Sequence, residues 1–149
     1  MIRSLFAAVL LVAAHAQAYC VSNETDRDVS VVQERHPSSM RDERKLNRVL
    51  APKAQACCQF HNLDCNPLGR ANSVVNLEVR ILGEPAYACG FPPGAEPNVK
   101  VTGAGTIRIL HNPRRSAYPY VVRVRTQDHK DLTGPRGLPC TDSKPRGSR

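Results

Sequence analysis

Short apolar stretches recur along the chain, and within them the apolar positions have a period of two residues. In residues 73–82, SVVNLEVRIL, every second position from Val75 to Ile81 is apolar and the positions between them are polar. Alternation of this kind predicts a β-strand with one face in a core and the other in solvent. Gly83 and Pro85 follow directly and end the segment.

Four other segments, 29–33, 99–102, 106–111 and 118–126, are predicted as strands on the same grounds. The glycine-rich residues 103–105 predict a turn that joins two of them in a hairpin. Strands at roughly ten-residue spacing, with turn residues between them, favour an all-β fold over alternating strands and helices. We therefore predict a small antiparallel β-sandwich, jelly-roll or immunoglobulin-like in outline.

Residues 41–50, RDERKLNRVL, fit two secondary structures equally well. Leu46, Val49 and Leu50 have helical spacing, but the apolar content is low and Pro52 follows at once. A short helix and a strand both remain open for this segment.

The amino-terminal residues have the three parts of a secretory signal peptide. Arg3 precedes an apolar run over 5–14, and Ala16-Gln17-Ala18 forms a small-residue cleavage site. The run is shorter than the about 20 residues that a membrane-spanning helix needs. We expect a signal peptide over 1–18, a secreted extracellular chain without a transmembrane segment, one domain over 19–140, and a basic disordered tail over 141–149.

The cysteines predict a disulfide framework. All of them lie beyond the expected cleavage site, and they are Cys20, Cys57, Cys58, Cys65, Cys89 and Cys140. An even number in a secreted chain of this size favours three disulfides, whose pairing the sequence leaves open. If residues 57–58 are extended, their side chains point to opposite faces. One of them can then reach the core or a neighbouring strand while the other closes the short loop to Cys65.

The segment 57–66, CCQFHNLDCN, also contains the ligand types of two metal sites. Its cysteines with His61 could hold zinc, and its alternating Asn62, Asp64 and Asn66 could form a weak calcium loop. An oxidising compartment favours disulfides over zinc, and the glycine and glutamate of an EF-hand are missing. Asn and Asp also build turns through their own side chains. We therefore predict a structural staple and neither a metal nor a cofactor.

The chain is basic, with 21 Lys and Arg against 13 Asp and Glu, a formal net charge of +8. Loss of Arg3 with the signal peptide leaves 20 against 13, or +7. Such a charge attracts anionic polysaccharides and phospholipid headgroups, although it also serves solubility alone. Nucleic acid is not expected, because only 5% of the residues are aromatic and few could stack on bases.

Arginines within the predicted strands are the candidate ligand-binding residues. Alternation sets four of them on outward faces: Arg80, Arg108, Arg123 and Arg125. If their strands are neighbours, these side chains form a basic face. Such a face could bind sulfated or uronic polysaccharide, or phospholipid headgroups, through bidentate contacts.

No motif of a hydrolase is present: the chain contains neither Gly-x-Ser-x-Gly nor His-Glu-x-x-His. A histidine-dependent ribonuclease is the alternative, with His61 and His111 as acid and base and Arg108 or Lys100 at the phosphate. Nothing in the spacing selects that pair, so we expect a protein that is not an enzyme.

Two modification signals remain. The sequon at Asn23 predicts a glycosylated loop at the surface, and the dibasic pair Arg114-Arg115 is a possible site of proteolytic processing.

The order of these features resembles a set of small secreted cysteine-rich fungal proteins of uncharacterised function. Those chains similarly pair an early Cys-x-x-Asn, here at Cys20, with a CC…N-x-D-C-N segment, here 57–66, followed by a strand and two later cysteines. The resemblance implies a compact, disulfide-bonded β-sandwich and brings no activity with it. We expect an effector, defence or toxin-like protein that binds an anionic partner or a host surface protein.

Overall fold

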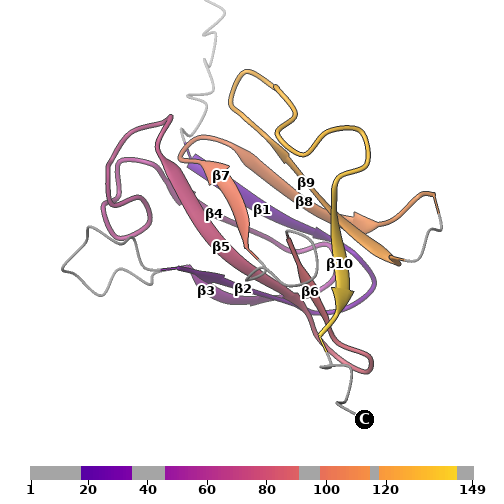
Figure 1. Ribbon diagram of the computed structural model, residues 1–149. Helices are drawn as coiled ribbons and strands as arrows, with labels where there is room; N and C mark the ends of the chain where they lie inside the picture. The colour runs from indigo at the N-terminus through magenta and orange to yellow at the C-terminus, as the bar shows by residue number, and fades with distance from the viewer. Residues whose placement is uncertain (1–17, 35–45, 91–97, 115–117, 144–149) are drawn as a thin grey trace, which may run out of the picture.

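The computed structural model describes residues 18–34, 46–90, 98–114 and 118–143. These residues contain no helix, and the all-β prediction is confirmed (Figure 1). Their strands are β1 (Ala18–Glu24), β2 (Val29–Gln33), β3 (Asn47–Leu50), β4 (Gln55–Gln59), β5 (Val74–Ile81), β6 (Tyr87–Cys89), β7 (Val99–Thr102), β8 (Thr106–His111), β9 (Tyr120–Arg125) and β10 (Leu138–Asp142). No helix that could cross a membrane occurs in the part of the chain that the structure describes.

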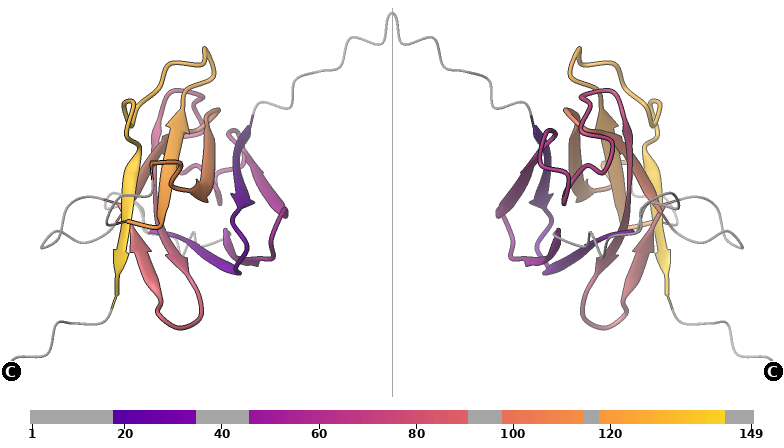
Figure 2. Two further views of the ribbon diagram at one scale, coloured as in Figure 1. Left: turned by 90° about the vertical axis from the view of Figure 1, so that its right-hand side faces the viewer. Right: turned by 90° about the vertical axis from the view of Figure 1, so that its left-hand side faces the viewer.

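The strands form one sheet in the order β3-β2-β5-β6-β10-β9-β8-β1-β4, with β7 paired to β5 beside this path. The sheet curls until it is nearly closed, so that β1 and β4 lie on the side opposite β10 (Figure 2). We call the end at which β1 begins the first end, and the end at which β1 finishes the second end. The jelly-roll or immunoglobulin-like outline stays a prediction.

One pair of strands corrects the prediction of a wholly antiparallel sheet. β1 and β8 run parallel, in register from Cys20 opposite Thr106 to Glu24 opposite Leu110. Parallel neighbours need a long crossover connection, and here the chain builds β2 to β7 before it returns beside β1.

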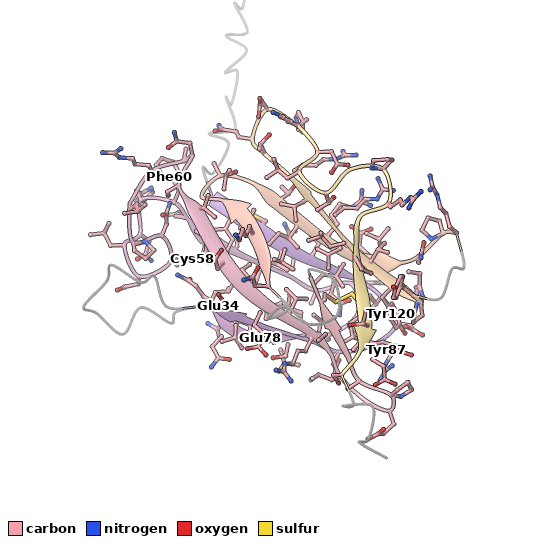
Figure 3. The ribbon with its side chains drawn as sticks, viewed as in Figure 1. Glu34, Cys58, Phe60, Glu78, Tyr87 and Tyr120 are labelled. Atoms are coloured by element: carbon pink, nitrogen blue, oxygen red, sulfur yellow. A yellow bond between two sulfur atoms is a disulfide. The ribbon has the colours of Figure 1, made fainter. Side chains whose placement is uncertain are left out.

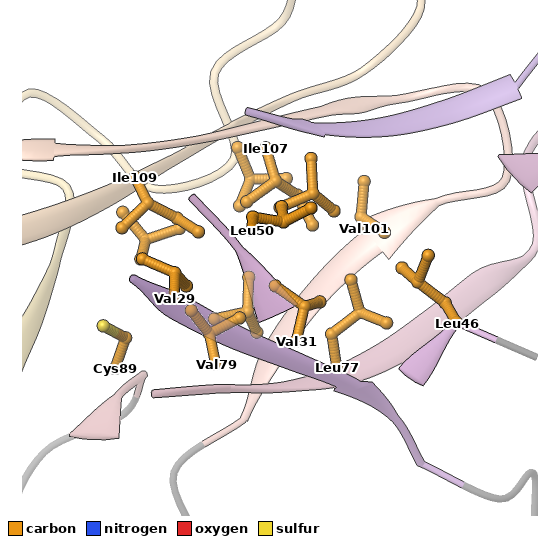
Figure 4. Close-up of a cluster of buried hydrophobic side chains, with 14 of the residues drawn as sticks. Val29, Val31, Leu46, Leu50, Leu77, Val79, Cys89, Val101, Ile107 and Ile109 are labelled. Atoms are coloured by element: carbon orange, nitrogen blue, oxygen red, sulfur yellow. The ribbon is translucent and has the colours of Figure 1, made fainter. Parts of the chain in front are cut away.

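The core lies inside the curled sheet. The four apolar residues that alternate along β5 are all buried, and they pack against inward side chains of β2 and β8 (Figure 4). One polar contact occurs inside, where the Tyr19 hydroxyl donates to Oε1 of Gln33 at 3.1 Å. Burial raises the pKa of Tyr19 well above its ordinary value. The apolar residues that recur at every second position of the sequence are therefore the ones that form the core, and the residues between them lie on the outer face.

The predicted hairpin at residues 103–105 is wrong, although β7 and β8 have the predicted bounds. β7 pairs with β5, whereas β8 pairs with β1 and β9. The turn between them is buried: a Cβ on Gly103 would lie 2.3 Å from Nδ2 of Asn66 and 2.5 Å from the carbonyl oxygen of Arg70. The loop before β5 thus covers this turn, and the two strands leave it toward different neighbours.

The ambiguous segment 41–50 ends as a strand, since β3 covers Asn47–Leu50, while residues 41–45 lie outside the described residues. β10 continues past Cys140 to Asp142, where the sequence predicts the start of a tail. Thr141 pairs with Ala88 and extends the sheet. Residues 1–17 of the expected signal peptide and 144–149 of the expected tail also lie outside the described residues.

The predicted disulfides are confirmed: Cys20–Cys57, Cys58–Cys65 and Cys89–Cys140. Because β4 is extended, Cys57 and Cys58 face opposite sides, as predicted. Cys57 is exposed and bonds to its cross-strand neighbour on β1, whereas Cys58 is buried and closes the short loop that follows β4.

Candidate functional site

The register of β8 and β9 brings three of the four predicted arginines together. Arg108 lies directly opposite Arg123, and Thr106 lies opposite Arg125. Each arginine alternates with buried residues, so all three side chains point away from the core. We call Arg108, Arg123 and Arg125 the arginine face.

The fourth predicted arginine, Arg80, is not part of this face. It lies on β5, which β6 and β10 separate from β9 in the sheet order. Its guanidinium is hydrogen-bonded to Glu78, two residues away on the same strand. Alternation along β5 predicted that Arg80 and Glu78 point outward, but it carried no information on where β5 lies relative to β9 in the sheet.

Carboxylates flank the arginine face on both sides. Glu24 on β1 accepts two hydrogen bonds from Arg108, from Nε at 2.5 Å and from Nη2 at 2.7 Å. These bonds hold the pKa of Glu24 below its ordinary value and raise the pKa of Arg108. On the other side, Nη1 of Arg123 lies 3.9 Å from Oδ2 of Asp131, and its Nη2 donates to the carbonyl oxygen of Pro135 at 3.1 Å.

Arg125 differs from the other two members of the face. It is exposed, and it makes no ion pair with any residue that the structure describes. The face therefore has two neutralised arginines at its centre and one unneutralised cation toward the first end.

A second group of titratable side chains lies at the second end. Oδ1 of Asp26, in the turn between β1 and β2, accepts a hydrogen bond from the Tyr120 hydroxyl at 3.0 Å. Nε2 of His111 lies 3.2 Å from the same oxygen. The hydrogen bond from Tyr120 is the main cause of the lowered pKa of Asp26. Burial, and then this hydrogen bond, raise the pKa of Tyr120.

Aromatic contacts extend this group across the second end. The rings of Tyr87 and Tyr120 meet edge to face at 5.4 Å between centroids, and both project from neighbouring parts of the sheet (Figure 3). The guanidinium carbon of Arg27 lies 5.6 Å from the centre of the Tyr87 ring. The arrangement fastens the β1–β2 turn to β6, β8 and β9. Because the pKa of Asp26 is lowered, its carboxyl is a poor proton donor at neutral pH.

The two histidines of the ribonuclease alternative do not form one site. His61 follows β4, whose last residue Gln59 is opposite Ala18, whereas His111 follows Leu110, which is opposite Glu24. Six residue steps along an extended strand correspond to about 20 Å. Acid and base at the two ends of β1 cannot act on one phosphate.

The segment 57–66 is a disulfide staple, as predicted. Every cysteine is in a disulfide, and no group of three His, Cys, Asp or Glu side chains suited to a metal occurs within the described ranges. Oδ1 of Asn62 accepts a hydrogen bond from the backbone nitrogen of Asp64, and the buried Asn66 donates to the carbonyl oxygen of Arg70. These amide groups build the turn, as the sequence predicted.

The expected surface position of the sequon is wrong. Asn23 lies in β1 and is fully buried. Its Nδ2 donates to the carbonyl oxygens of Arg27 and Leu50, both at 2.8 Å, and its Oδ1 accepts from the nitrogen and hydroxyl of Thr25. With every hydrogen-bonding position occupied inside the protein, the folded chain has no room for a glycan at this residue.

Sequence reasoning missed the group at Asp26. Its two hydrogen-bonded members, Asp26 and Tyr120, are 94 residues apart, and only the pairing of β1 with β8 and of β8 with β9 brings them together. Comparison with known proteins does not extend the assignment. No family model, curated protein or solved structure matches this chain.

Proposed function

We propose that this protein is secreted and acts without catalysis, by binding an anionic partner through the arginine face. The observation that carries the proposal is the register of β8 and β9, which sets Arg108 opposite Arg123 and adds Arg125 to the same face. Sulfated or uronic polysaccharide and phospholipid headgroups are the partners that such a face fits.

The charge balance of the face supports this role. Like charges directly opposite one another on paired strands are destabilising. Glu24 and Asp131 pair with Arg108 and Arg123 and offset this repulsion, so the charge of the face that has no ion-pair partner among the described residues is that of Arg125, opposite Thr106. A bound sulfate, carboxylate or phosphate would complete the balance through bidentate hydrogen bonds, which are stronger than those between neutral groups.

Secretion is supported by two independent features. Three disulfides are typical of oxidising compartments outside the cytosol, and the amino-terminal segment has the parts of a signal peptide. Cleavage after Ala18 would leave six of the seven residues of β1 in place. An effector, defence or toxin-like role in a fungus follows from the resemblance of the cysteine pattern.

Retention on a sulfated-polysaccharide column tests the binding role. The double variant Arg123→Ser/Arg125→Ser should elute at clearly lower salt than the wild type, because it loses two of the three cations of the face. Arg80→Ser is the matched control, since it removes the same charge from an exposed strand position outside the face. Equal losses in the control and in a single Arg125→Ser variant would mean that net charge alone governs retention.

Sequencing of the amino terminus tests secretion. Protein recovered from the medium of the producing cells should begin at Tyr19. An intact Met1 on protein found only inside the cells would overturn this part of the proposal.

A further inference from the structure

Exposed apolar side chains gather at the first end of the sheet. The described residues include six large hydrophobic residues that are exposed, and four of them lie at this end: Leu63, Leu68, Val74 and Leu132. Leu63 and Leu68 belong to the loop between β4 and β5, and Val74 is the first residue of β5. Leu132 belongs to the loop between β9 and β10.

The register places both loops at one end although they are distant in sequence. β4 finishes at Gln59, opposite Ala18, and β9 finishes at Arg125, opposite Thr106. Thr106 is in turn opposite Cys20, so both strands end beside the beginning of β1. Figure 1 and Figure 2 show the two loops projecting from the same end.

A disulfide and hydrogen bonds hold the two loops that carry the leucines. The Cys58–Cys65 disulfide closes the first loop, and Asn66 fixes it through Arg70 and Ser73. The exposed fractions of Leu63 and Leu68 are 48% and 51%, although they flank the same short turn. In the second loop, the Thr126 hydroxyl accepts a hydrogen bond from the nitrogen of Lys130 at 3.1 Å. Each loop therefore presents leucine side chains to solvent at the first end.

The loops that carry these leucines, and the adjoining end of β9, also carry exposed cations. Within the described part of the chain, no ion pair involves Arg70, Arg125, Lys130 or Arg136. The carboxylates of the second loop are engaged: Asp128 accepts from Thr126, and Asp131 accepts from Thr133 and lies near Arg123. Arg70, Arg125, Lys130 and Arg136 are all exposed, and they lie on the two loops that carry the leucines or on the end of β9 that leads into the second loop.

We propose that the first end docks on a lipid bilayer that contains anionic phospholipid. Leu63, Leu68 and Leu132 would enter the boundary between headgroups and acyl chains, and the flanking cations would contact the phosphates. A hydrated polyanion offers nothing to apolar side chains, whereas a bilayer offers both an apolar layer and negative charge. The inference rests on the proposed function in taking an anionic partner, and it names a lipid surface as that partner.

Sedimentation with vesicles tests the docking. The wild type should partition onto phosphatidylcholine vesicles that contain about a third phosphatidylserine, and much less onto phosphatidylcholine alone. The triple variant Leu63→Ser/Leu68→Ser/Leu132→Ser should partition at least about tenfold less. Val49→Ser is the matched control, because Val49 is 60% exposed on β3, away from the first end. The amino-terminal segment is identical in all of these proteins, so it does not affect the comparison.

The substitutions replace exposed side chains, and near-ultraviolet circular dichroism with a count of free thiols checks that each variant is folded. Unchanged partitioning of the triple variant would overturn the inference, as would equal binding of the wild type to both vesicle types. A concentration-dependent dimer that the leucine substitutions abolish would also overturn it, since the surface would then be a subunit interface.

Retention on the sulfated-polysaccharide column separates the two proposals. The triple leucine variant should elute with the wild type, because its charge is unchanged. If it does so but still binds vesicles normally, only the docking inference fails. If the wild type binds neither the column nor anionic vesicles, the proposed function fails and the docking inference fails with it.

Discussion

Replacement of Asn23 by alanine should destabilise the protein more than most single substitutions. The side chain makes four hydrogen bonds, between 2.7 and 3.0 Å long, to Thr25 and Arg27 in the turn between β1 and β2 and to Leu50 at the end of β3. Alanine removes all four and leaves the carbonyl oxygen of Leu50 and the nitrogen of Thr25 without these buried partners.

The size of the effect follows from those two groups. A buried polar group that loses its partner costs about 1–3 kcal/mol, so the free energy of unfolding should fall by about 3 kcal/mol. For a domain of this length the midpoint of thermal unfolding should fall by about 6–12 °C. The cost should not depend on salt, because no charge is involved.

Equilibrium unfolding in guanidinium chloride, followed by far-ultraviolet circular dichroism with the disulfides intact, measures the change. Asn47→Ala is the matched control, because Asn47 is an exposed asparagine on β3. Protein from a host that attaches no N-linked glycan removes any contribution of glycosylation. A loss below about 0.5 kcal/mol would refute the reasoning, because it would mean that water or the backbone replaces the amide without cost.

Three further outcomes are expected. Tyr120→Phe should lower the free energy of unfolding at neutral pH, because it removes the hydrogen bond to Asp26. The difference in unfolding free energy between variant and wild type should narrow as pH falls below the ordinary Asp pKa of 3.8. Because the pKa of Asp26 is lowered in the folded protein, its carboxylate stabilises the fold above that pH, and this stabilisation is lost in acid. Urea unfolding measures the free energy of unfolding of both proteins, and a difference between them that stays constant from pH about 6 to about 2 would contradict this reasoning. Loop-closure entropy predicts the loss in unfolding free energy when both cysteines of a disulfide are replaced. The loss should be about 4 kcal/mol for Cys89–Cys140, which spans 51 residues, and about 2 kcal/mol for Cys58–Cys65, which spans 7. Equal thermal midpoints of the two variants would argue against this. Gly103→Ala should reduce the yield of folded protein in a secretion assay, because the added methyl group would clash with Asn66 and Arg70. A yield equal to that of the wild type would mean that the loop before β5 can move aside without cost.

β2, β5, β7, β8 and β9 were predicted from apolar positions at every second residue or from clusters of β-branched residues, whereas β1, β4, β6 and β10 were not predicted as strands. β5 alternates over Val75–Ile81 and β8 over Thr106–Ile109, which leaves one face apolar and the other polar. β6 has only three residues, and β4 is mostly exposed, so neither has the pattern that burial of one face produces. Their place in the sheet depends on pairing with distant strands and on the disulfides that connect them.

The candidate site divides in the same way. The outward direction of the arginines is a local property of alternation and was predicted, whereas their grouping depends on strand order. Arg80 satisfies the local rule as well as Arg108 does, yet it lies on another part of the sheet. Asn23 is the opposite case: asparagine is usually a surface residue, but Asn23 is buried because four hydrogen bonds to three residues satisfy its amide.

The parallel pairing of β1 with β8 sets an order of events during synthesis. β1 leaves the ribosome first, but one of its two neighbours is complete only when His111 has been added. Its other neighbour, β4, is made much earlier, and Cys20 can bond to Cys57 at that stage. The Cys20–Cys57 disulfide can therefore connect β1 to β4 before β8 has been made. Cys89 on β6 bonds to Cys140 on β10, so this disulfide can form only after β10 has been made.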